Sequence, residues 1–354
     1  MESRTVTPAE LGIPAAFPLP RRRDWRIGMV GFGGIARCHL DGYRSQGWSV
    51  AAICDTDPAA RAAAAVACPS ARICEDYRDL VRDERVEVVS LLTQPTLRLP
   101  VVEACAEAGK PLQTEKPLAG TVEEAERMAA VADRAGIRLA VGQNRRWSPA
   151  NFMAHQIIRA GLIGEPFYAS VTIHDRQDVV LAQHPFYSRC TDFLTVQWDN
   201  HMADLQRYWT GRDAVRVLAC TRRMKGQNFV SDNLLLVVTD FGEGVTGHVT
   251  HSELLRSALT ESSCRVDGDR GSLVFELAGP RLQIDSAVLG GGPTEMDLSG
   301  VAWHSSLCGP MADLLISIEQ DREPLVSARR NLPTIRAVVA EDRSARAGGR
   351  WVDC

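Results

Sequence analysis

A glycine-rich turn near the N-terminus constrains the fold of this chain more than any other feature. Residues 26–33 read RIGMVGFG, an apolar run that ends in glycines, and residues 35–46 have the spacing of a helix. Between them lies the pattern G-x-G-x-x-A, formed by Gly31, Phe32, Gly33, Gly34, Ile35 and Ala36. Glycines let the backbone turn sharply and let a pyrophosphate come close, and the small sixth residue lets the helix pack on the strand. The pattern predicts dinucleotide binding, with an ordinary tight turn as the alternative.

Strands and helices alternate through the rest of the N-terminal part. Further strands are expected at 48–55, 86–93, 111–116 and 138–144, and helices at 57–67, 99–110 and 121–136. The strands are short runs rich in Val, Ile and Leu, and such strands separated by helices are typical of a parallel sheet covered on both faces. The sequence therefore predicts an α/β fold with a doubly wound parallel sheet of the Rossmann type.

The alternation of strands and helices ends after about Gln143. From there on, most of the expected strands follow one another with turns between them. These strands cover 165–175, 214–223, 233–241, 244–253 and 264–277. Helices are expected at 151–161, 199–211, 308–321 and 331–348. This order predicts an α+β domain with an open, mostly antiparallel sheet. We expect an N-terminal extension at 1–24, a Rossmann domain at 25–143 and the α+β domain at 144–354.

The composition argues against several classes of function. A net charge of -4 provides no large basic field for nucleic acid, and the chain has no apolar run long enough to span a bilayer. The ten cysteines show neither a C-x-x-C pair nor the spacing of a zinc site, so we expect no metal and a reduced, cytoplasmic setting. The basic triplet at 21–23 follows a mildly apolar stretch instead of preceding it, so the extension does not read as a signal peptide.

Asp55 bears on which dinucleotide is bound. It ends the second expected strand, where a carboxylate can hydrogen-bond the ribose hydroxyls of adenosine. Its charge would repel a 2′-phosphate, and Asp57 adds to that repulsion while serving mainly as a helix cap. No lysine or arginine follows at once. The sequence predicts NAD as the cofactor, with NADP less favoured.

Lysine is rare in this chain, which makes its position at 116 informative. The chain has 40 lysine and arginine residues, and its only lysines are Lys110, Lys116 and Lys225. Because arginine is used at nearly every other basic position, a lysine here is unlikely to be an ordinary surface residue. Lys116 lies in the run Thr114-Glu115-Lys116-Pro117 at the end of a strand, where open α/β sheets bind ligands. An ammonium there can stabilise the alkoxide that develops as a hydride leaves carbon. A surface lysine paired with Glu115 is the alternative.

Four segments together resemble the Gfo/Idh/MocA oxidoreductases, the family of glucose-fructose oxidoreductase and inositol dehydrogenase. They are the glycine turn, the triplet Glu115-Lys116-Pro117, the run Gln143-Asn144-Arg145-Arg146-Trp147 and the run His201-Met202-Ala203-Asp204. The resemblance extends from about Arg26 to the end of the chain. It implies a Rossmann domain followed by a domain whose open sheet commonly forms subunit contacts. A homodimer or homotetramer through that sheet is therefore expected.

The resemblance also implies roles for individual residues. Lys116 would contact the substrate oxygen and His201 would act as general acid/base, which suits an imidazole near neutral pH. Without the resemblance, a lone histidine on a half-buried helix face is usually structural. The expected cofactor residues are Gly31, Phe32, Gly33, Gly34, Ile35, Asp55, Thr93, Pro95, Glu115, Lys116 and Asn144. The expected substrate residues are Lys116, Arg146, Trp147, Gln197, Asn200 and His201.

The chain departs from the family pattern at three positions. Gln197 stands where many members have an aspartate four residues before the histidine, and Asp199 stands where they have glycine. Gln197 can hydrogen-bond a substrate hydroxyl but cannot raise the basicity of the histidine, and Asp199 could do so only if the loop differs. Asp204 is expected to be a structural hydrogen-bond partner. Leu99 replaces a frequent histidine after the Thr93-Gln94-Pro95 turn, which would reshape the cofactor rim.

The expected function is NAD-dependent hydride transfer with a secondary alcohol or ketone of a small polyhydroxylated substrate, meaning a sugar, sugar derivative or cyclitol. Two alternatives are an NAD-assisted enzyme that cleaves glycosides by oxidation, elimination and reduction, and a non-catalytic NAD-sensing protein. The stretch 174–190 fits a substrate-facing loop or a solvated surface loop equally well. His248 and His251 are expected on opposite faces of one strand, which argues against a shared metal site.

Overall fold

A computed structural model describes residues 4–177, 181–228, 230–298, 301 and 306–354. The chain divides into two units, which are named here after their sheets. The parallel-sheet unit consists of Pro18–Asn144 and His304–Leu332. The large-sheet unit consists of Met1–Phe17, Arg145–Trp303 and Pro333–Cys354.

The parallel-sheet unit confirms the predicted Rossmann-type sheet. Among its described residues, six strands lie in the order β4-β3-β2-β5-β6-β7, and every pair is parallel. The strands are β2 Arg26–Val30, β3 Ser49–Cys54, β4 Arg72–Cys74, β5 Val88–Leu91, β6 Leu112–Thr114 and β7 Leu139–Val141. The helices are α1 Gly34–Ser45, α2 Pro58–Ala67, α3 Tyr77–Val81, α4 Leu99–Glu107, α5 Val122–Ala135 and α9 Cys308–Glu319. The strand order reverses between β2 and β5, and the carboxyl ends of strands at such a switch point are where α/β sheets bind ligands.

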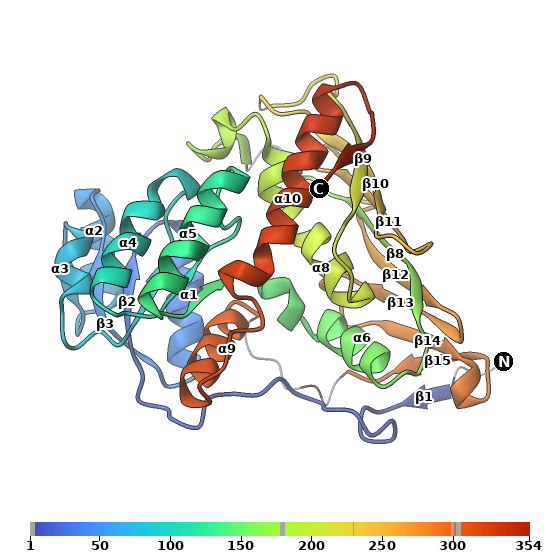
Figure 1. Cartoon of the computed structure of the whole chain (residues 1–354), viewed down its shortest axis with the longest axis horizontal. Helices are drawn as coiled ribbons and strands as arrows, with labels where there is room; N and C mark the ends of the chain where they lie inside the picture. Colours follow the sequence, from blue (N-terminus) through green and yellow to red (C-terminus); the bar gives the residue numbers. More distant parts are fainter. Residues whose placement is uncertain (1–3, 178–180, 229, 299–300, 302–305) are drawn as a thin grey trace. The chain divides into compact units, whose positions relative to one another are not determined.

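Helix α9 belongs with the parallel sheet, although the sequence placed 308–321 in the second domain. It packs against β6, β7 and α1, and residues 308–317 are all buried. In Figure 1 this orange-red helix lies beside the blue α1 of the same unit. A helix that is buried all round needs cover on several sides, and the parallel sheet and α1 supply it. The division expected at 143/144 therefore differs from the grouping in the structure.

The large-sheet unit has the predicted open and mostly antiparallel sheet. Its described strands lie in the order β1-β15-β14-β13-β12-β8-β11-β10-β9-β16, and only the β8–β11 and β1–β15 pairs are parallel. The strands are β1 Arg4–Val6, β8 Pro166–His174, β9 Arg216–Arg222, β10 Leu234–Asp240, β11 Thr246–Ser252, β12 Glu261–Gly268, β13 Gly271–Glu276, β14 Leu282–Ser286, β15 Pro293–Met296 and β16 Val352–Asp353.

One face of this large sheet is covered by helices. Helix α6 Pro149–Arg159, helix α8 Asn200–Thr210 and the later part of α10 Ala328–Arg346 lie on the same side of it (Figure 1). Buried and accessible residues alternate along the strands, as a sheet with one covered face requires. Leu236 and Val274, at alternate positions to the buried ones, stay 42% and 40% exposed.

The expected N-terminal extension is partly ordered into the fold. Residues 4–6 form β1, which pairs in parallel with β15, and the stretch up to Phe17 belongs to the large-sheet unit. Within the residues that the structure describes, no helix combines the length and the apolar character that a membrane crossing requires.

Candidate active site

The glycine turn has the geometry that its pattern predicts. The backbone of Gly31 has a φ of 94°, and its N–H donates to the carbonyl of Cys54 at 2.8 Å. A Cβ at Gly31 would lie 3.1 Å from the carbonyl of Leu92, so a larger residue would have both strain and a close contact. Around Gly33 and Gly34, in contrast, no described atom lies within 4 Å of an added Cβ. The turn therefore leaves open space where helix α1 begins.

The start of α1 is suited to a phosphate group. No side chain of the described residues caps the helix at Gly33, and its first turn contains no acidic residue. The first N–H groups of a helix have no partners within the helix, and the helix dipole makes this end positive. Open space, the N–H groups of a helix start and the positive end of the helix dipole together fit the pyrophosphate of a dinucleotide.

Asp55 links the glycine turn to the start of α2. One of its carboxylate oxygens accepts from the N–H of Phe32 at 2.7 Å, and the other accepts from the N–H of Asp57 at 2.9 Å. Asp57 caps α2 by accepting from Ala59 at 2.9 Å, as expected. Arg61, which was not predicted to take part, donates to the carbonyl of Asp55 at 3.0 Å. The carboxylate of Asp55 is thus held at the end of β3, and a guanidinium lies close to its backbone.

Arg98 connects the loops that follow β5 and β6. Its side chain is buried, with the residue 2% exposed, and it donates twice to the carbonyl of Thr93, at 3.0 and 2.7 Å. It also donates to the carbonyls of Glu115 and Pro117, which flank Lys116. Pro95 begins a short 3-10 helix between Thr93 and Arg98. The predicted cofactor residues Thr93 and Glu115 are therefore joined by an arginine that sequence reasoning missed.

Glu115 is held by a buried chain of hydrogen bonds. Its carboxylate lies 2.7 Å from Nε2 of His39, Nδ1 of His39 lies 3.1 Å from the hydroxyl of Tyr43, and that hydroxyl lies 2.9 Å from Ser90. Burial alone would raise the pKa of Glu115, but the bond and charge of His39 and the charges of Lys116 and Arg98 lower it below its usual range. Glu115 is therefore held as a carboxylate next to the lysine.

His201 lies at an unusual helix junction in the large-sheet unit. A π-helix, Phe193–Trp198, leads through Asp199 into α8, and His201 is the second residue of α8. Gln197, Asn200 and His201 are all largely buried, with exposed fractions of 6%, 0% and 6%. The junction thus brings three of the predicted substrate residues onto one short segment, and π-helical turns are frequent at functional sites.

Arg146 has a structural partner in the same unit. Its guanidinium makes two hydrogen bonds to the carboxylate of Asp204, at 2.6 and 2.7 Å, and lies 4.8 Å from the ring centre of Tyr208. Thr334 also donates to Asp204, at 3.3 Å. The structural role expected for Asp204 is confirmed. Contact between Arg146 and a substrate stays a prediction, and the ion pair shows that the arginine also holds helix α8.

The remaining predicted residues are placed as follows. Trp147 is buried in the large-sheet unit, and Asn144 donates to Ser306 at 3.2 Å in the parallel-sheet unit. Lys116 is partly buried, and because it and His201 belong to different units, their convergence stays a prediction. Residues 178–180 of the expected loop at 174–190 lie outside the described residues. His251 is buried against Glu253, 2.7 Å away.

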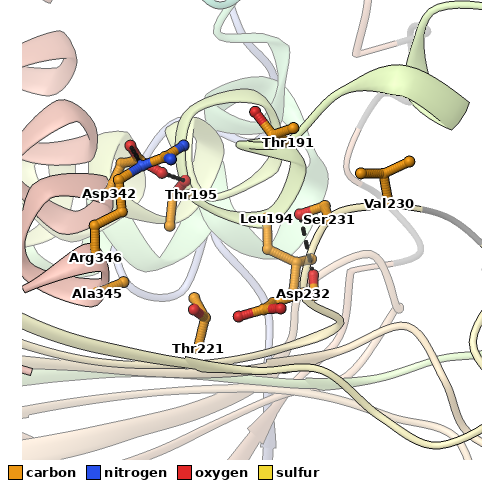
Figure 2. Close-up of a pocket in the computed structure, with 10 residues that line it drawn as sticks. All are labelled: Thr191, Leu194, Thr195, Thr221, Val230, Ser231, Asp232, Asp342, Ala345 and Arg346. Carbon is orange, nitrogen blue, oxygen red and sulfur yellow. Dashed lines mark hydrogen bonds and ion pairs between the residues drawn. The ribbon is translucent and has the colours of Figure 1, made fainter. Parts of the chain in front are cut away.

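A polar pocket of about 240 Å³ opens in the large-sheet unit (Figure 2). The carboxylate of Asp342 accepts from Thr195 at 3.2 Å and from Arg346 at 2.6 Å beside it. Its lining residues are Thr191, Leu194, Thr195, Thr221, Val230, Ser231, Asp232, Asp342, Ala345 and Arg346. The pocket is bordered by the π-helix that leads to His201 and by α10, and none of the predicted site residues lines it.

Comparisons with known proteins agree with both sheets. Residues 25–143 match the model described as an oxidoreductase family with an NAD-binding Rossmann fold, and residues 153–274 match the GFO/IDH/MocA C-terminal domain. The chain is 29% identical to the D-apiose dehydrogenase of Paraburkholderia graminis over 331 residues, which cover 90% of this chain and 87% of that protein. It is 31% identical to an inositol 2-dehydrogenase of Rubrobacter xylanophilus over 143 residues, 40% of this chain and 41% of that protein.

A solved structure shares the fold. It is an oxidoreductase from Agrobacterium radiobacter in complex with NAD+, L-tartaric acid and magnesium, with a TM-score of 0.84 and 24% identity. The match covers 93% of this chain and 98% of that one. At this level of identity the likeness concerns the fold alone.

Proposed function

This chain belongs to the GFO/IDH/MocA family of NAD-binding oxidoreductases, and from that membership we propose that it moves a hydride between a nicotinamide cofactor and a secondary alcohol or ketone of a sugar, sugar derivative or cyclitol. The observation that carries the proposal is the uncapped start of α1 beside the open space at Gly33 and Gly34. The names of the two dehydrogenase relatives, one for a sugar and one for a cyclitol, support the substrate class.

Lys116 and His201 carry the proposed chemistry. A bound nicotinamide supplies the hydride chemistry. Lys116 Nζ donates to the oxygen on the reacting carbon and stabilises negative charge there, while the imidazole of His201 takes the hydroxyl proton. Arg98 and Glu115 act on this lysine indirectly, because they hold the backbone on either side of it. Gln197 and Asn200 hydrogen-bond substrate hydroxyls.

The test is an absorbance assay at the nicotinamide band with NAD or NADP and a panel of pentoses, hexoses, sugar acids and cyclitols, in both directions. We expect at least one of them to be oxidised or reduced. If the absorbance at the nicotinamide band changes with none of these compounds, the proposal is contradicted. Cleavage of a glycoside without added cofactor, by protein that purifies with bound NAD, would favour the oxidation–elimination–reduction alternative. NAD binding with no turnover of any sugar that raises Tm would favour an NAD sensor.

We propose that NAD is preferred over NADP because of the fixed carboxylate of Asp55. Asp55→Asn is expected to weaken NAD binding by roughly 10–150-fold, since a hydrogen bond to a charged group contributes about 1.5–3 kcal/mol. Binding of NADP should improve in the same variant, because the repulsion is gone and Arg61 lies close by. Fluorescence titration of both cofactors measures the ratio. Asp57→Asn is the control, because asparagine also caps a helix, and an equal change in both variants would reject the role of Asp55.

We infer that the uncovered face of the large sheet joins two copies of the chain. The resemblance to the family implies that the open sheet forms subunit contacts, and Leu236 on β10 and Val274 on β13 each expose an apolar side chain on the sheet. A homodimer or homotetramer is expected by analytical ultracentrifugation, and Leu236→Asp should shift the mass toward that of one chain. A monomeric parent protein at micromolar concentration would reject the inference.

A further inference from the structure

Two cysteines face each other at the carboxyl ends of neighbouring strands in the parallel sheet. Cys54 is the last residue of β3, Cys74 is the last residue of β4, and the register of the two strands pairs them directly. The thiol of Cys54 donates to the carbonyl of Glu75 at 3.3 Å. The thiol of Cys74 donates to the carbonyl of Ile53 at 3.6 Å. Each thiol therefore reaches the residue that is adjacent to the other cysteine.

The spacing of this pair suits a disulfide. Neighbouring strands lie about 4.7–4.9 Å apart, and a disulfide joins Cα atoms that are about 4.4–6.8 Å apart. Residues that are paired in register also direct their side chains to the same face of the sheet. Cys54 and Cys74 are both free thiols in this structure. Rotation of the two side chains away from their carbonyl partners would bring the sulfur atoms within bonding distance.

The same two cysteines hold the backbone of the predicted cofactor site. The carbonyl of Cys54 accepts from the N–H of Gly31 at 2.8 Å. The carbonyl of Cys74 accepts from the N–H of Asp55 at 3.3 Å. Gly31 begins the glycine turn, and Asp55 is the residue on which the proposed preference for NAD depends. A bond that moves the two cysteines therefore acts on both parts of this site.

Cys74 is the more reactive of the two thiols. It lies on β4, the edge strand of the parallel sheet as described, and it is 8% exposed, against 3% for Cys54. The neighbouring thiol of Cys54 and the charge of Arg72 lower the pKa of Cys74, although burial opposes them. The neighbouring thiol of Cys74 and burial raise the pKa of Cys54. Because the thiolate is the nucleophile, Cys74 attacks an oxidant first.

We propose that Cys54 and Cys74 form a reversible disulfide that weakens dinucleotide binding under oxidising conditions. The oxidant is a small-molecule disulfide such as oxidised glutathione. The thiolate of Cys74 attacks one of its sulfur atoms, which forms a mixed disulfide and releases one glutathione thiolate. The thiolate of Cys54 then attacks the sulfur of Cys74 and releases the second. Two protein thiols are oxidised, one small disulfide is reduced to two thiols, and the two protons pass from the cysteines to the released thiolates.

The two parts of this proposal rest on different observations. Formation of the disulfide rests on the register and the thiol contacts of Cys54 and Cys74. The effect on the cofactor rests on the proposed function, because it needs the glycine turn and Asp55 to bind the dinucleotide. The experiments below therefore measure the bond and the affinity separately.

Peptide mapping tests the bond. Folded protein is incubated with oxidised glutathione, its remaining thiols are blocked by alkylation, and it is digested with trypsin without reductant. Cleavage after arginine separates three neighbouring cysteines into the peptides 45–61, 62–72 and 73–78, which contain Cys54, Cys68 and Cys74. We expect 45–61 to be joined to 73–78, and the link to disappear when dithiothreitol is added.

Peptide 62–72 is an internal control for this mapping. The thiol of Cys68 is directed to the carbonyl of Val50 at 3.9 Å, so this peptide should stay alkylated and unlinked. Absence of the link between 45–61 and 73–78 overturns the proposal. A link from 62–72 to either of the other two peptides in its place also overturns it.

Fluorescence titration of NADH tests the consequence. The oxidised parent should bind NADH roughly 3–10-fold more weakly than the same protein after reduction, which is the size of effect expected when one hydrogen bond is lost. This ratio should be one in Cys74→Ser and in Cys54→Ser, which cannot form the bond, and either variant serves if the other fails to fold. Cys38→Ser is the control, because Cys38 is an exposed cysteine of the same unit, and it should keep the parental ratio.

The remaining outcomes separate this proposal from the proposed function. A ratio that persists in both Cys54→Ser and Cys74→Ser, or that disappears in Cys38→Ser, overturns the proposal, because another thiol then causes the effect. A linked pair with unchanged NADH affinity overturns the effect on the cofactor. Reduced protein that binds NADH but converts no sugar or cyclitol contradicts the proposed function, and a parental ratio above one then still supports the disulfide.

Discussion

Replacing Lys116 with methionine is expected to lower kcat by roughly 10²–10³-fold while NAD(H) affinity stays nearly unchanged. Methionine is unbranched and only one atom shorter than lysine, but it has no proton to donate to the substrate oxygen, so negative charge that develops there loses its stabilising partner. The loops themselves should persist, because Arg98 and His39 hold the backbone and Glu115 next to position 116. Steady-state kinetics on the best sugar or cyclitol and fluorescence titration of NADH separate the two quantities.

Lys225→Met is the matched control for this substitution. Lys225 is exposed in the large-sheet unit, and its loss should leave both kcat and cofactor affinity at parental values. If Lys116→Met loses NADH binding but keeps its kcat, the role of Lys116 is to bind the cofactor and not to contact the substrate. An unchanged kcat together with unchanged binding would remove Lys116 from the mechanism.

Arg98→Met is expected to reduce the free energy of unfolding by about 3 kcal/mol, because it leaves buried carbonyl oxygens without donors. The guanidinium serves the carbonyls of Thr93, Glu115 and Pro117, and water has little access to this buried residue. The loops after β5 and β6 would lose their connection, so activity should fall together with stability. Urea unfolding followed by circular dichroism gives the change in midpoint.

Arg127→Met is the control for the loss of an arginine in the same unit. Arg127 pairs with Glu103 at 2.7 Å, but its side chain is 63% exposed, and surface ion pairs contribute only about 0–1 kcal/mol. The two variants should therefore differ severalfold in the loss of stability. An Arg98→Met protein that unfolds at the parental midpoint would show that the carbonyls find other partners and that Arg98 does not hold the two loops.

The alternation of strands and helices was enough to predict the parallel sheet, because its strands are apolar and its glycine turn is specific. Five short elements were not predicted, namely β1, β4, α3, β14 and β15. Each has five residues or fewer and, unlike the equally short β6 and β7, does not alternate with clearly periodic helices on both sides. The grouping of α9 with the first sheet depends on packing between distant segments, which local periodicity does not encode.

In the candidate site, the motifs identified residues that lie inside a recognisable sequence pattern, such as the glycine turn and the Glu115-Lys116-Pro117 triplet. Residues whose role depends on a contact with a residue far away in the sequence were not predicted. His39 and Glu115 are 76 positions apart, and Arg98 reads in the sequence as one basic residue at the start of an apolar helix. Asp199 was noticed as a departure from the family pattern, but its complete burial depends on packing by distant segments.

The division of the chain has a consequence for building hybrid proteins. The backbone passes from one unit to the other after residues 17, 144, 303 and 332, so neither unit is one uninterrupted stretch. A hybrid joined at a single point near residue 144 would cover β6 and β7 of one parent with α9 of the other. Swapping substrate preferences between relatives therefore calls for two-segment grafts, in which α9 travels with the strands it shields.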